Sequence, residues 1–319
     1  MRALLLLSAA LLAGCETLSY YGQAAGGQLA LIARAQPIGE VQADARLRER
    51  LALATAIRDF ASRDLGLPEN NAYRSYAELD RPYALWNVVA APEFSLAPVL
   101  SCFPIAGCVS YRGYYAKEDA ERHARARREE GHDVLVYGVP AYSTLGWFDD
   151  PLLSTFIHYP DADLARLIFH ELAHQVVYVK DDSTFNESFA VVVEREGLRR
   201  WLAAQGKVPG ALRDVGAEIA AARASLGALY RSRLAPEAMR ERKREVMESL
   251  RPVVARLPSL EGQAPNNAFL AAYATYNDLV PMFEKLLTEE GGELRAFYAR
   301  VKRLASERST PGPSSAPSR

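Results

Sequence analysis

Apolar residues recur at helical spacing in two segments of the first 180 positions. Between residues 43 and 65, leucines and an isoleucine lie three or four residues apart, and Gly66-Leu67-Pro68 ends the pattern. A second pattern follows Pro160, with Asp161 as the expected N-cap. Its apolar stripe consists of Leu164, Leu167, Ile168, Leu172 and Val176. Each segment predicts an α-helix with one buried face.

Short apolar runs between these helices predict β-strands. Three of them cover Leu85 to Val89, Val109 to Tyr114 and Val134 to Val139, and a helix from Lys117 to Glu130 precedes the third. A fourth run, Ala141 to Phe148, predicts a strand directly before the helix that follows Pro160. Its Trp147 and Phe148 are explained equally well as core aromatics.

The second half of the chain has helical patterns almost throughout. The expected helices are Ala211 to Leu234, Pro236 to Leu257, Asn266 to Tyr276, Pro281 to Glu290 and Glu293 to Glu307. Residues 309–319, rich in Ser and Pro, are expected to be a disordered tail. The pattern as a whole predicts an α+β fold with a small mixed sheet and a largely helical C-terminal half.

The first fifteen residues have the pattern of an export signal. Met1-Arg2 precede an apolar run from Ala3 to Leu12, which is too short to span a bilayer. Leu12-Ala13-Gly14-Cys15 resembles the bacterial lipobox, in which the chain is cut before the cysteine and the cysteine carries lipid. That resemblance implies a lipid anchor facing the periplasm, and Glu16 favours the outer membrane. An ordinary signal peptide with a free cysteine is the alternative.

These boundaries predict a signal peptide over 1–14, a lipid-anchored tether with some helical character over 15–37 and one domain over 38–308. Loss of residues 1–14 removes Arg2 alone among the charged residues, so the formal net charge changes from −1 to −2. A chain near neutrality without basic clusters lacks the positive surface that binding to nucleic acid requires. We therefore expect no nucleic-acid partner.

The cysteines fit an exported protein. With Cys15 assigned to lipid, Cys102 and Cys108 remain, six positions apart. In an oxidising compartment they can close a small disulfide loop. Two buried free thiols are the alternative, and no histidine lies at a ligand spacing that would make them a metal site.

His170-Glu171-Leu172-Ala173-His174 is the strongest chemical signal in the chain. A helix brings residues i and i+4 to one face, so both imidazoles can bind one metal ion, and Glu171 lies beside the open coordination position as a general base. Two core histidines that only satisfy hydrogen bonds are the alternative. Nitrogen and carboxylate ligands favour one Zn²⁺ ion, without excluding manganese, cobalt or iron.

Glu187 is the expected third ligand. It lies thirteen residues after His174, at the start of an apolar helix that ends near Gly206. The polar turn Lys180 to Ser183 would make the two helices antiparallel and bring Glu187 back to the histidine pair. An ordinary first-turn glutamate is the alternative.

Together these residues resemble the gluzincin metallopeptidases, and Asn186-Glu187-Ser188-Phe189-Ala190 is similar to the corresponding run of their aminopeptidase branch. An acidic residue follows seven positions later in that branch. Here it is Glu194, which the resemblance implies would orient a ligand histidine, with Asn186 as a further supporting residue. A solvated glutamate is the alternative. The interval between His174 and Glu187 is shorter than in well-known gluzincins.

Most of the mature chain also resembles the bacterial predicted-aminopeptidase lipoproteins, which implies a zincin-like fold and a peptide substrate. By that resemblance, Glu171 takes a proton from a zinc-activated water that attacks the peptide carbonyl. A tyrosine or histidine would stabilise the oxyanion. The candidates are Tyr276 and Tyr273, followed by His158 and Tyr142.

Three activities are compatible with this site. Aminopeptidase action requires an acidic group for the free ammonium of the substrate, and the sequence does not identify one. Endopeptidase or oligopeptidase action is therefore the nearest alternative. A metal-binding scaffold or chaperone lipoprotein without turnover is another, although a purely structural site has no need of Glu171.

Overall fold

A three-stranded antiparallel sheet forms one side of the protein. The computed structural model describes residues 20–103, 107–208, 215–257, 260 and 262–309. In this sheet β3 (Leu85–Pro92) lies between β6 (Arg112–Tyr114) and β7 (His132–Val139). Val88 is opposite Arg112 on one side and Val136 on the other. The expected strand from Val109 to Tyr114 is divided, because Val109 ends a separate strand and β6 begins at Arg112.

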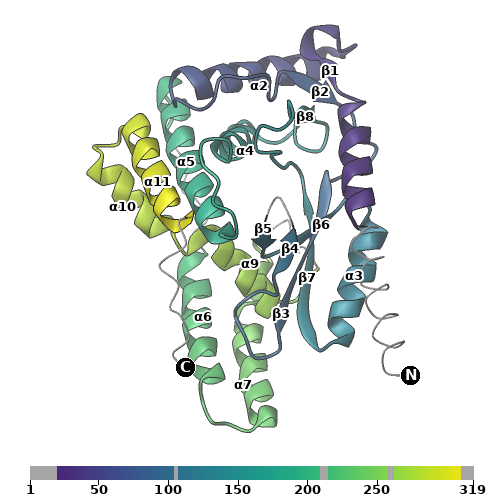
Figure 1. Ribbon diagram of the computed structural model, residues 1–319, viewed down its shortest axis with the longest axis vertical. Helices are drawn as coiled ribbons and strands as arrows, with labels where there is room; N and C mark the ends of the chain where they lie inside the picture. The colour runs from purple at the N-terminus through teal and green to yellow at the C-terminus, as the bar shows by residue number, and fades with distance from the viewer. Residues whose placement is uncertain (1–19, 104–106, 209–214, 258–259, 261, 310–319) are drawn as a thin grey trace, which may run out of the picture.

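Side chains alternate between the two faces of this sheet, as a pleated strand requires. Val88 and Ala90 pack toward α3 (Lys117–Glu129), whereas Val89 and Ala91 pack toward the C-terminal helices. Figure 1 shows α3 on one face of the sheet and α9 on the other. The sheet is therefore buried on both faces.

Two smaller sheets complete the β-structure of the described ranges. β2 (Ser75–Ala77) pairs antiparallel with β1 (Gln36–Pro37) and parallel with β8 (Leu152–Leu153). β4 (Ser101–Phe103) and β5 (Gly107–Val109) form a two-stranded antiparallel sheet.

Helices from both halves of the chain build the largest core, and three of them lie at its centre. α2 (Ala45–Arg63) lies across α4 (Asp161–Ala173) and α5 (Ser183–Ala204), as Figure 1 shows. Asp44 caps α2 by accepting a hydrogen bond from the backbone N–H of Leu47. The expected cap of α4 is wrong by one residue: Pro160 is the N-cap, and Asp161 is the first helical residue, paired with Arg50.

The C-terminal half is helical, as its pattern predicts. After α5 come α6 (Gly216–Tyr230), α7 (Pro236–Ser249), α8 (Arg251–Val254), α9 (Asn267–Asn277), α10 (Val280–Glu289) and α11 (Leu294–Ser309), whereas the short 3₁₀ helix η1 (Ile38–Glu40) lies near the N-terminus. The single helix expected from 236 to 257 is divided after Ser249, next to Pro252, which has no N–H to donate. The α+β class is confirmed.

The segment expected to be a tether contains a helix that packs on the body. Residues 20–32 are helical, and Leu31 is buried in the core formed by α2, α4 and α5. The ring of Tyr20 stacks on Phe103 at 5.1 Å between centroids. The helical character expected of this segment is therefore present in residues 20–32, and this helix packs on the body.

The strand expected from Ala141 to Phe148 is wrong. The backbone turns there, with φ of 58° at Leu145 and 82° at Gly146, which an extended strand cannot accommodate. Asp150 stabilises the turn by accepting hydrogen bonds from the N–H and the Oγ1 of Thr144, both at 2.8 Å. The assignment of its aromatics to the core is also wrong, because Trp147 is 72 % exposed and Phe148 47 % exposed.

Asp150 makes the stability of the protein depend on pH. Burial raises the pKa of this carboxyl to about 6, against the lowering effect of the Thr144 hydrogen bonds. The pKa of this carboxyl in the unfolded chain is near 3.9. The protonated form of Asp150 therefore contributes fully to stability below about pH 4, and this contribution, at most about 3 kcal/mol, is lost as pH rises through about 6. Asp150→Asn cannot ionise.

We therefore expect the free energy of unfolding of wild type to fall relative to that of Asp150→Asn between pH 4 and 7. Urea unfolding at several pH values measures this difference. Asp80→Asn, at an exposed position, is the control. Parallel curves for wild type and Asp150→Asn would contradict the assignment.

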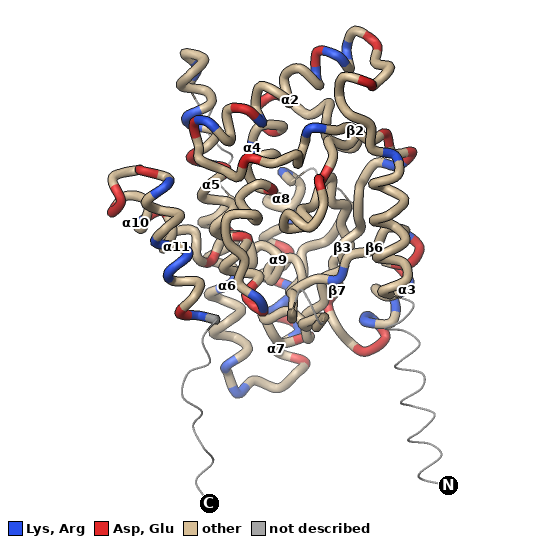
Figure 2. The backbone as a smooth tube through the Cα atoms, turned by 45° about the horizontal axis from the view of Figure 1, so that its top comes forward, with Lys and Arg blue, Asp and Glu red and all other residues tan. Residues whose placement is uncertain are grey.

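The surface carries both charge signs along most helices, as Figure 2 shows. In the ranges that the structure describes, none of the helices combines the length and apolar character needed to cross a bilayer. The expected signal peptide, Cys15, and residues 310–319 of the expected tail lie outside the described residues, as does the expected start of α6 at Ala211.

Candidate metal centre

Three side chains from α4 and α5 converge at the centre of the protein. Nε2 of His170 lies 3.2 Å from Oε2 of Glu187, and Nε2 of His174 lies 3.5 Å from the same oxygen. One ligand atom from each of these residues lies within 4.8 Å of the other two. Their side chains are 12 %, 9 % and 8 % exposed. The predicted trio is therefore assembled and could bind a metal ion.

The turn between α4 and α5 sets this geometry. Asp182 caps α5 by accepting a hydrogen bond from the N–H of Phe185 at 2.9 Å. The carboxamide of Asn186 accepts from the N–H of Val179 and donates to its carbonyl, both at 2.8 Å. Asn186 thus fixes the returning backbone one residue before Glu187.

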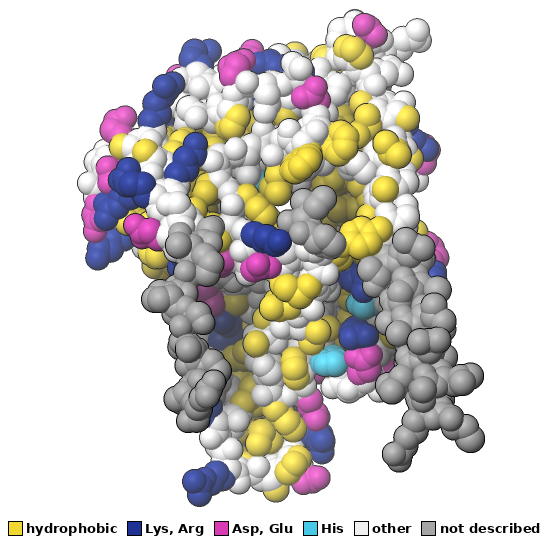
Figure 3. Space-filling model, in the orientation of Figure 1, with side chains coloured by type: hydrophobic (Ala, Val, Ile, Leu, Met, Phe, Trp, Pro, Cys, Tyr) yellow, Lys and Arg dark blue, Asp and Glu magenta, His cyan; other side chains and the backbone are white. Residues whose placement is uncertain are grey.

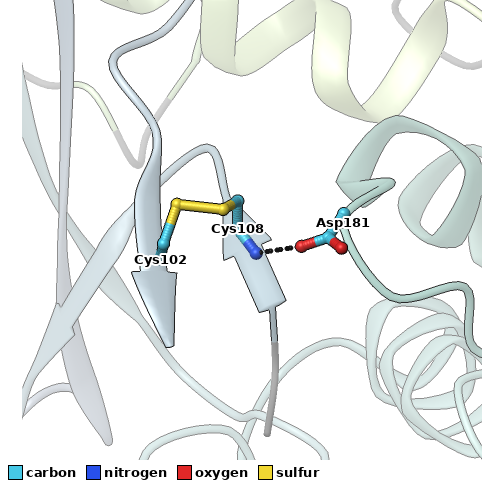
Figure 4. Close-up of a disulfide and its surroundings, with 3 residues drawn as sticks. All are labelled: Cys102, Cys108 and Asp181. Atoms are coloured by element: carbon cyan, nitrogen blue, oxygen red, sulfur yellow. Dashed lines mark hydrogen bonds between the residues drawn. A yellow bond between two sulfur atoms is a disulfide. The ribbon is translucent and has the colours of Figure 1, made fainter. Parts of the chain in front are cut away.

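A disulfide holds the outer side of the same turn. Cys102 and Cys108 join β4 to β5, and the N–H of Cys108 donates to Oδ1 of Asp181 at 2.5 Å (Figure 4). Asp181 has a φ of 68°, a left-handed conformation that aspartate tolerates better than most residues. A Cβ at Gly107 would lie 2.4 Å from that Oδ1. Glycine therefore permits this close contact.

Glu194 orients the first histidine. Its Oε2 lies 2.9 Å from Nδ1 of His170, and its Oε1 accepts a hydrogen bond from Arg166 at 2.6 Å. Glu194 is only 8 % exposed, so the solvated alternative is wrong. A proton on Nδ1 directed at Glu194 leaves Nε2 facing Glu187, which is the nitrogen that a metal would need.

The charges of the site favour an ionised Glu187. Burial raises the pKa of Glu187, but the charges and hydrogen bonds of His174 and His170 outweigh it and lower the pKa to about 2. Burial lowers the pKa of His170, and hydrogen bonds to Glu187 and Glu194 outweigh it, so this pKa is raised. A metal cation would therefore replace a proton at His170 on binding.

Glu171 lies beside the three ligand residues, and its pKa is raised whereas that of Glu187 is lowered. Burial raises the pKa of Glu171, and the charges of His170 and His174 oppose that effect incompletely. A carboxylate with a raised pKa is a better proton acceptor than an ordinary one near neutrality.

A cavity of about 600 Å³ opens onto these residues. Helix 20–32, β3, the segment from β5 to β6, and the loop after β7 form its walls. Most of its lining is apolar or aromatic, and tyrosines are the commonest type: Tyr20, Tyr21, Tyr111, Tyr115, Tyr142, Tyr178 and Tyr276. In the view of Figure 3, hydrophobic side chains gather across the upper right and along the lower middle of the face that is drawn.

The four candidate oxyanion donors divide into two pairs. Tyr276 lines the cavity with its ring 6.2 Å from that of His170, and Tyr142 lines it farther along, hydrogen-bonded to Tyr115 at 2.7 Å. Tyr273 packs at the edge of the core formed by α6, α7 and α9, and His158 is exposed. Neither lines the cavity, so the structure does not support these two assignments.

Sequence reasoning missed several residues around the site. Arg166 lies four residues before His170, so helical spacing puts it on the face of α4 that Glu194 contacts. Tyr111 and Tyr137 lie on or near strands far from the motif in sequence, and no local pattern indicates them. Tyr137 shares a hydrogen bond with Tyr276.

Comparison with known proteins identifies the family. The family model described as "Putative aminopeptidase" matches residues 19–311. Neither the curated proteins nor the solved structures provide a match. Because that alignment spans most of the 319 residues, the chain belongs to the putative aminopeptidase family.

Proposed function

We propose that this protein is a zinc-dependent peptidase of gluzincin type with a zincin-like fold, and that it removes amino-terminal residues from peptides. The convergence of His170, His174 and Glu187 next to Glu171 carries the proposal. The family supports peptidase activity, and a peptidase of this family would act on peptide substrates.

The donor set fits zinc. Two imidazole nitrogens and one carboxylate oxygen are three protein ligands, which leaves one coordination position open, as in catalytic zinc sites. When bound, zinc would lower the pKa of water and polarise the substrate carbonyl. His170 is already oriented for this task by Glu194.

The remaining chemistry belongs to the residues of the chain. Glu171 takes the proton of the attacking water and passes it to the leaving amine. Burial and the charge of Glu187 raise the pKa of Tyr276, so its hydroxyl stays protonated at neutral pH. Tyr276 can therefore donate a hydrogen bond to the oxyanion that develops on the substrate.

A direct assay separates the activities that this site permits. The purified protein is analysed for zinc and tested on amino-acid amides and on N-blocked peptides. Cleavage of free-amine substrates alone supports an aminopeptidase, and cleavage of blocked peptides indicates an endopeptidase. Zinc retention without cleavage of any peptide would favour the scaffold and overturn the enzymatic proposal.

Glu194→Gln is expected to weaken zinc binding about 10- to 100-fold, the usual cost of losing a carboxylate that orients a metal-bound histidine. The amide cannot both accept from His170 and Arg166 in their present geometry. Competition with a chromophoric chelator measures the affinity. Glu196→Gln, two residues along the same helix, is the control, and equal affinities for the two variants would contradict the orienting role.

We further propose that Cys15 is lipidated and anchors the protein in the bacterial envelope, on the periplasmic side and in the outer membrane. The lipobox-like sequence at residues 12–15 supports this location. Cys15→Ala should then be released from the membrane fraction, and membrane retention of that variant would refute the anchor.

A further inference from the structure

Asn87 is a buried polar side chain in the middle of the three-stranded sheet. It is 4 % exposed and belongs to β3, where it lies opposite Gly113 of β6 and Tyr137 of β7. Strands favour β-branched and aromatic residues, and asparagine is depleted in them. A buried carboxamide at the centre of a sheet therefore requires a physical explanation.

Only one end of this carboxamide has a partner among the described residues. Nδ2 of Asn87 donates to the hydroxyl of Tyr137 at 3.4 Å, whereas Oδ1 of Asn87 is buried and accepts no hydrogen bond from them. A buried acceptor without a donor destabilises a fold, so native proteins retain few such groups. The oxygen is thus free to accept from a ligand.

The cavity beside the metal centre reaches this acceptor because Gly113 has no side chain. Asn87, Gly113 and Leu85 line the same cavity as His170 and Glu171. A Cβ at Gly113 would lie 3.2 Å from Oδ1 of Asn87 and 3.8 Å from Cδ1 of Leu85. Glycine at this position therefore keeps space beside the free oxygen.

Asn87 also lies close to the residues that would act on the substrate. Tyr137 links it to Tyr276 through two consecutive hydrogen bonds, so the Asn87 carboxamide lies within about 7 Å of the Tyr276 hydroxyl. The ring of Tyr276 is 6.2 Å from that of His170. Because Tyr276 would contact the carbonyl that is attacked, the side chain of the residue carrying that carbonyl can reach Asn87.

The lining of the cavity defines which side chain fits there. Apart from the three ligand residues and Glu171, the described residues that line it are uncharged, and Leu85 and its cross-strand partner Val139 add apolar walls. A charged side chain would lose its hydration without gaining an opposite charge. A phenyl or aliphatic side chain would leave Oδ1 of Asn87 without a donor. An aromatic side chain that ends in a neutral donor meets both requirements.

We propose that Asn87 lies at the end of a specificity pocket for the residue on the amino side of the cleaved bond, and that its Oδ1 accepts a hydrogen bond from the phenol of a substrate tyrosine. The inference rests on the proposed peptidase function and names its substrate class, peptides that begin with tyrosine. Asn87 selects the substrate and takes no part in the chemical step.

The test measures binding without turnover. Zinc-loaded protein carrying Glu171→Gln is titrated by calorimetry with Tyr-Ala amide and with Phe-Ala amide, which differ by one hydroxyl. Tyr-Ala amide should bind about 5- to 100-fold more tightly, because phenylalanine leaves a buried acceptor unpaired. Adding Asn87→Leu should remove this preference, because leucine is similar in size and has no acceptor. Gln42→Leu, which replaces an exposed carboxamide outside the cavity, is the control and should retain the preference.

Gly113→Ala tests the space beside the oxygen and leaves Asn87 itself in place. The added Cβ would narrow the pocket, so this variant should weaken the binding of both aromatic dipeptides at least about 5-fold more than that of Ala-Ala amide. It provides the test if thermal unfolding shows that Asn87→Leu does not fold. Equal Kd values for Tyr-Ala and Phe-Ala amide in the Glu171→Gln protein would overturn the proposal. So would a tyrosine preference that survives Asn87→Leu in a folded protein.

Turnover distinguishes this inference from the proposed function. In protein with Glu171 intact, kcat/KM should favour tyrosine amide over phenylalanine amide by a similar factor, and Asn87→Leu should remove the difference. Tighter binding of Tyr-Ala amide without hydrolysis by any form would support the pocket and refute the peptidase. Hydrolysis of both amides without a preference for tyrosine would support the peptidase and refute the pocket.

Discussion

Glu171→Gln is expected to lower kcat for peptide hydrolysis by about 10²- to 10⁴-fold, the contribution of a positioned general base. The amide has nearly the same size but cannot take a proton from water. Glu171 is not one of the three converging ligand residues, so the zinc content should not change. Steady-state kinetics together with elemental analysis of the same samples measures both quantities.

Glu196→Gln is the matched control for this variant. Glu196 lies on α5 and is paired with Arg199 and Arg200, and it does not line the cavity. The control should retain wild-type kcat. If Glu171→Gln hydrolysed peptide at more than a tenth of the wild-type rate, another group would have to be the base.

The candidate metal site was predictable from sequence because it depends on local spacing. His170 and His174 share a helix face, and Glu194 lies seven residues after Glu187, which is two helical turns. A polar turn between two apolar helices was enough to bring the two histidines and the two glutamates together. The helices of the C-terminal half were predictable for the same reason, although residues near Pro252 divide one of them.

The walls of the cavity were not predictable because they depend on contacts between distant segments. Helix 20–32 follows a signal-like sequence and contains Gly22, Gly26 and Gly27, which favour the interpretation as a tether. It is held by partners more than 80 positions away, such as Tyr115. A Cβ at Gly27 would lie 2.2 Å from the Tyr115 ring, so glycine here serves close packing.

The prediction of a strand from Ala141 to Phe148 was wrong for a related reason. Its aromatic and β-branched residues favour a strand, yet no neighbouring strand pairs with it in the part of the chain that the structure describes. The buried carboxylate of Asp150 instead accepts the hydrogen bonds that a strand partner would accept. The edge strand beside the cavity is β6.

Glu187→Gln is expected to weaken zinc binding by at least about 100-fold, because loss of a direct ligand should cost more than loss of a residue that only orients one. The amide keeps the size of the side chain, so the change does not open a cavity. Competition with a chromophoric chelator measures the affinity, and Glu196→Gln is the control. An affinity within about threefold of wild type would mean that a different acid completes the site.

The metal-free protein provides an independent measure of the same carboxylate. The pKa of Glu187 is lowered to about 2, so its ionised form stabilises the fold above the unfolded value near 4.3, and this stabilisation is lost as pH falls from there through about 2. The Glu187→Gln variant has no ionisable carboxyl at this position, so it lacks this pH-dependent stabilisation. In the presence of a chelator, the stability advantage of wild type should therefore be largest above pH 5 and should shrink on acidification. An advantage that is constant with pH would mean that His170 and His174 do not stabilise the charged form of Glu187. The electrostatic argument for the proposed metal centre would then be wrong.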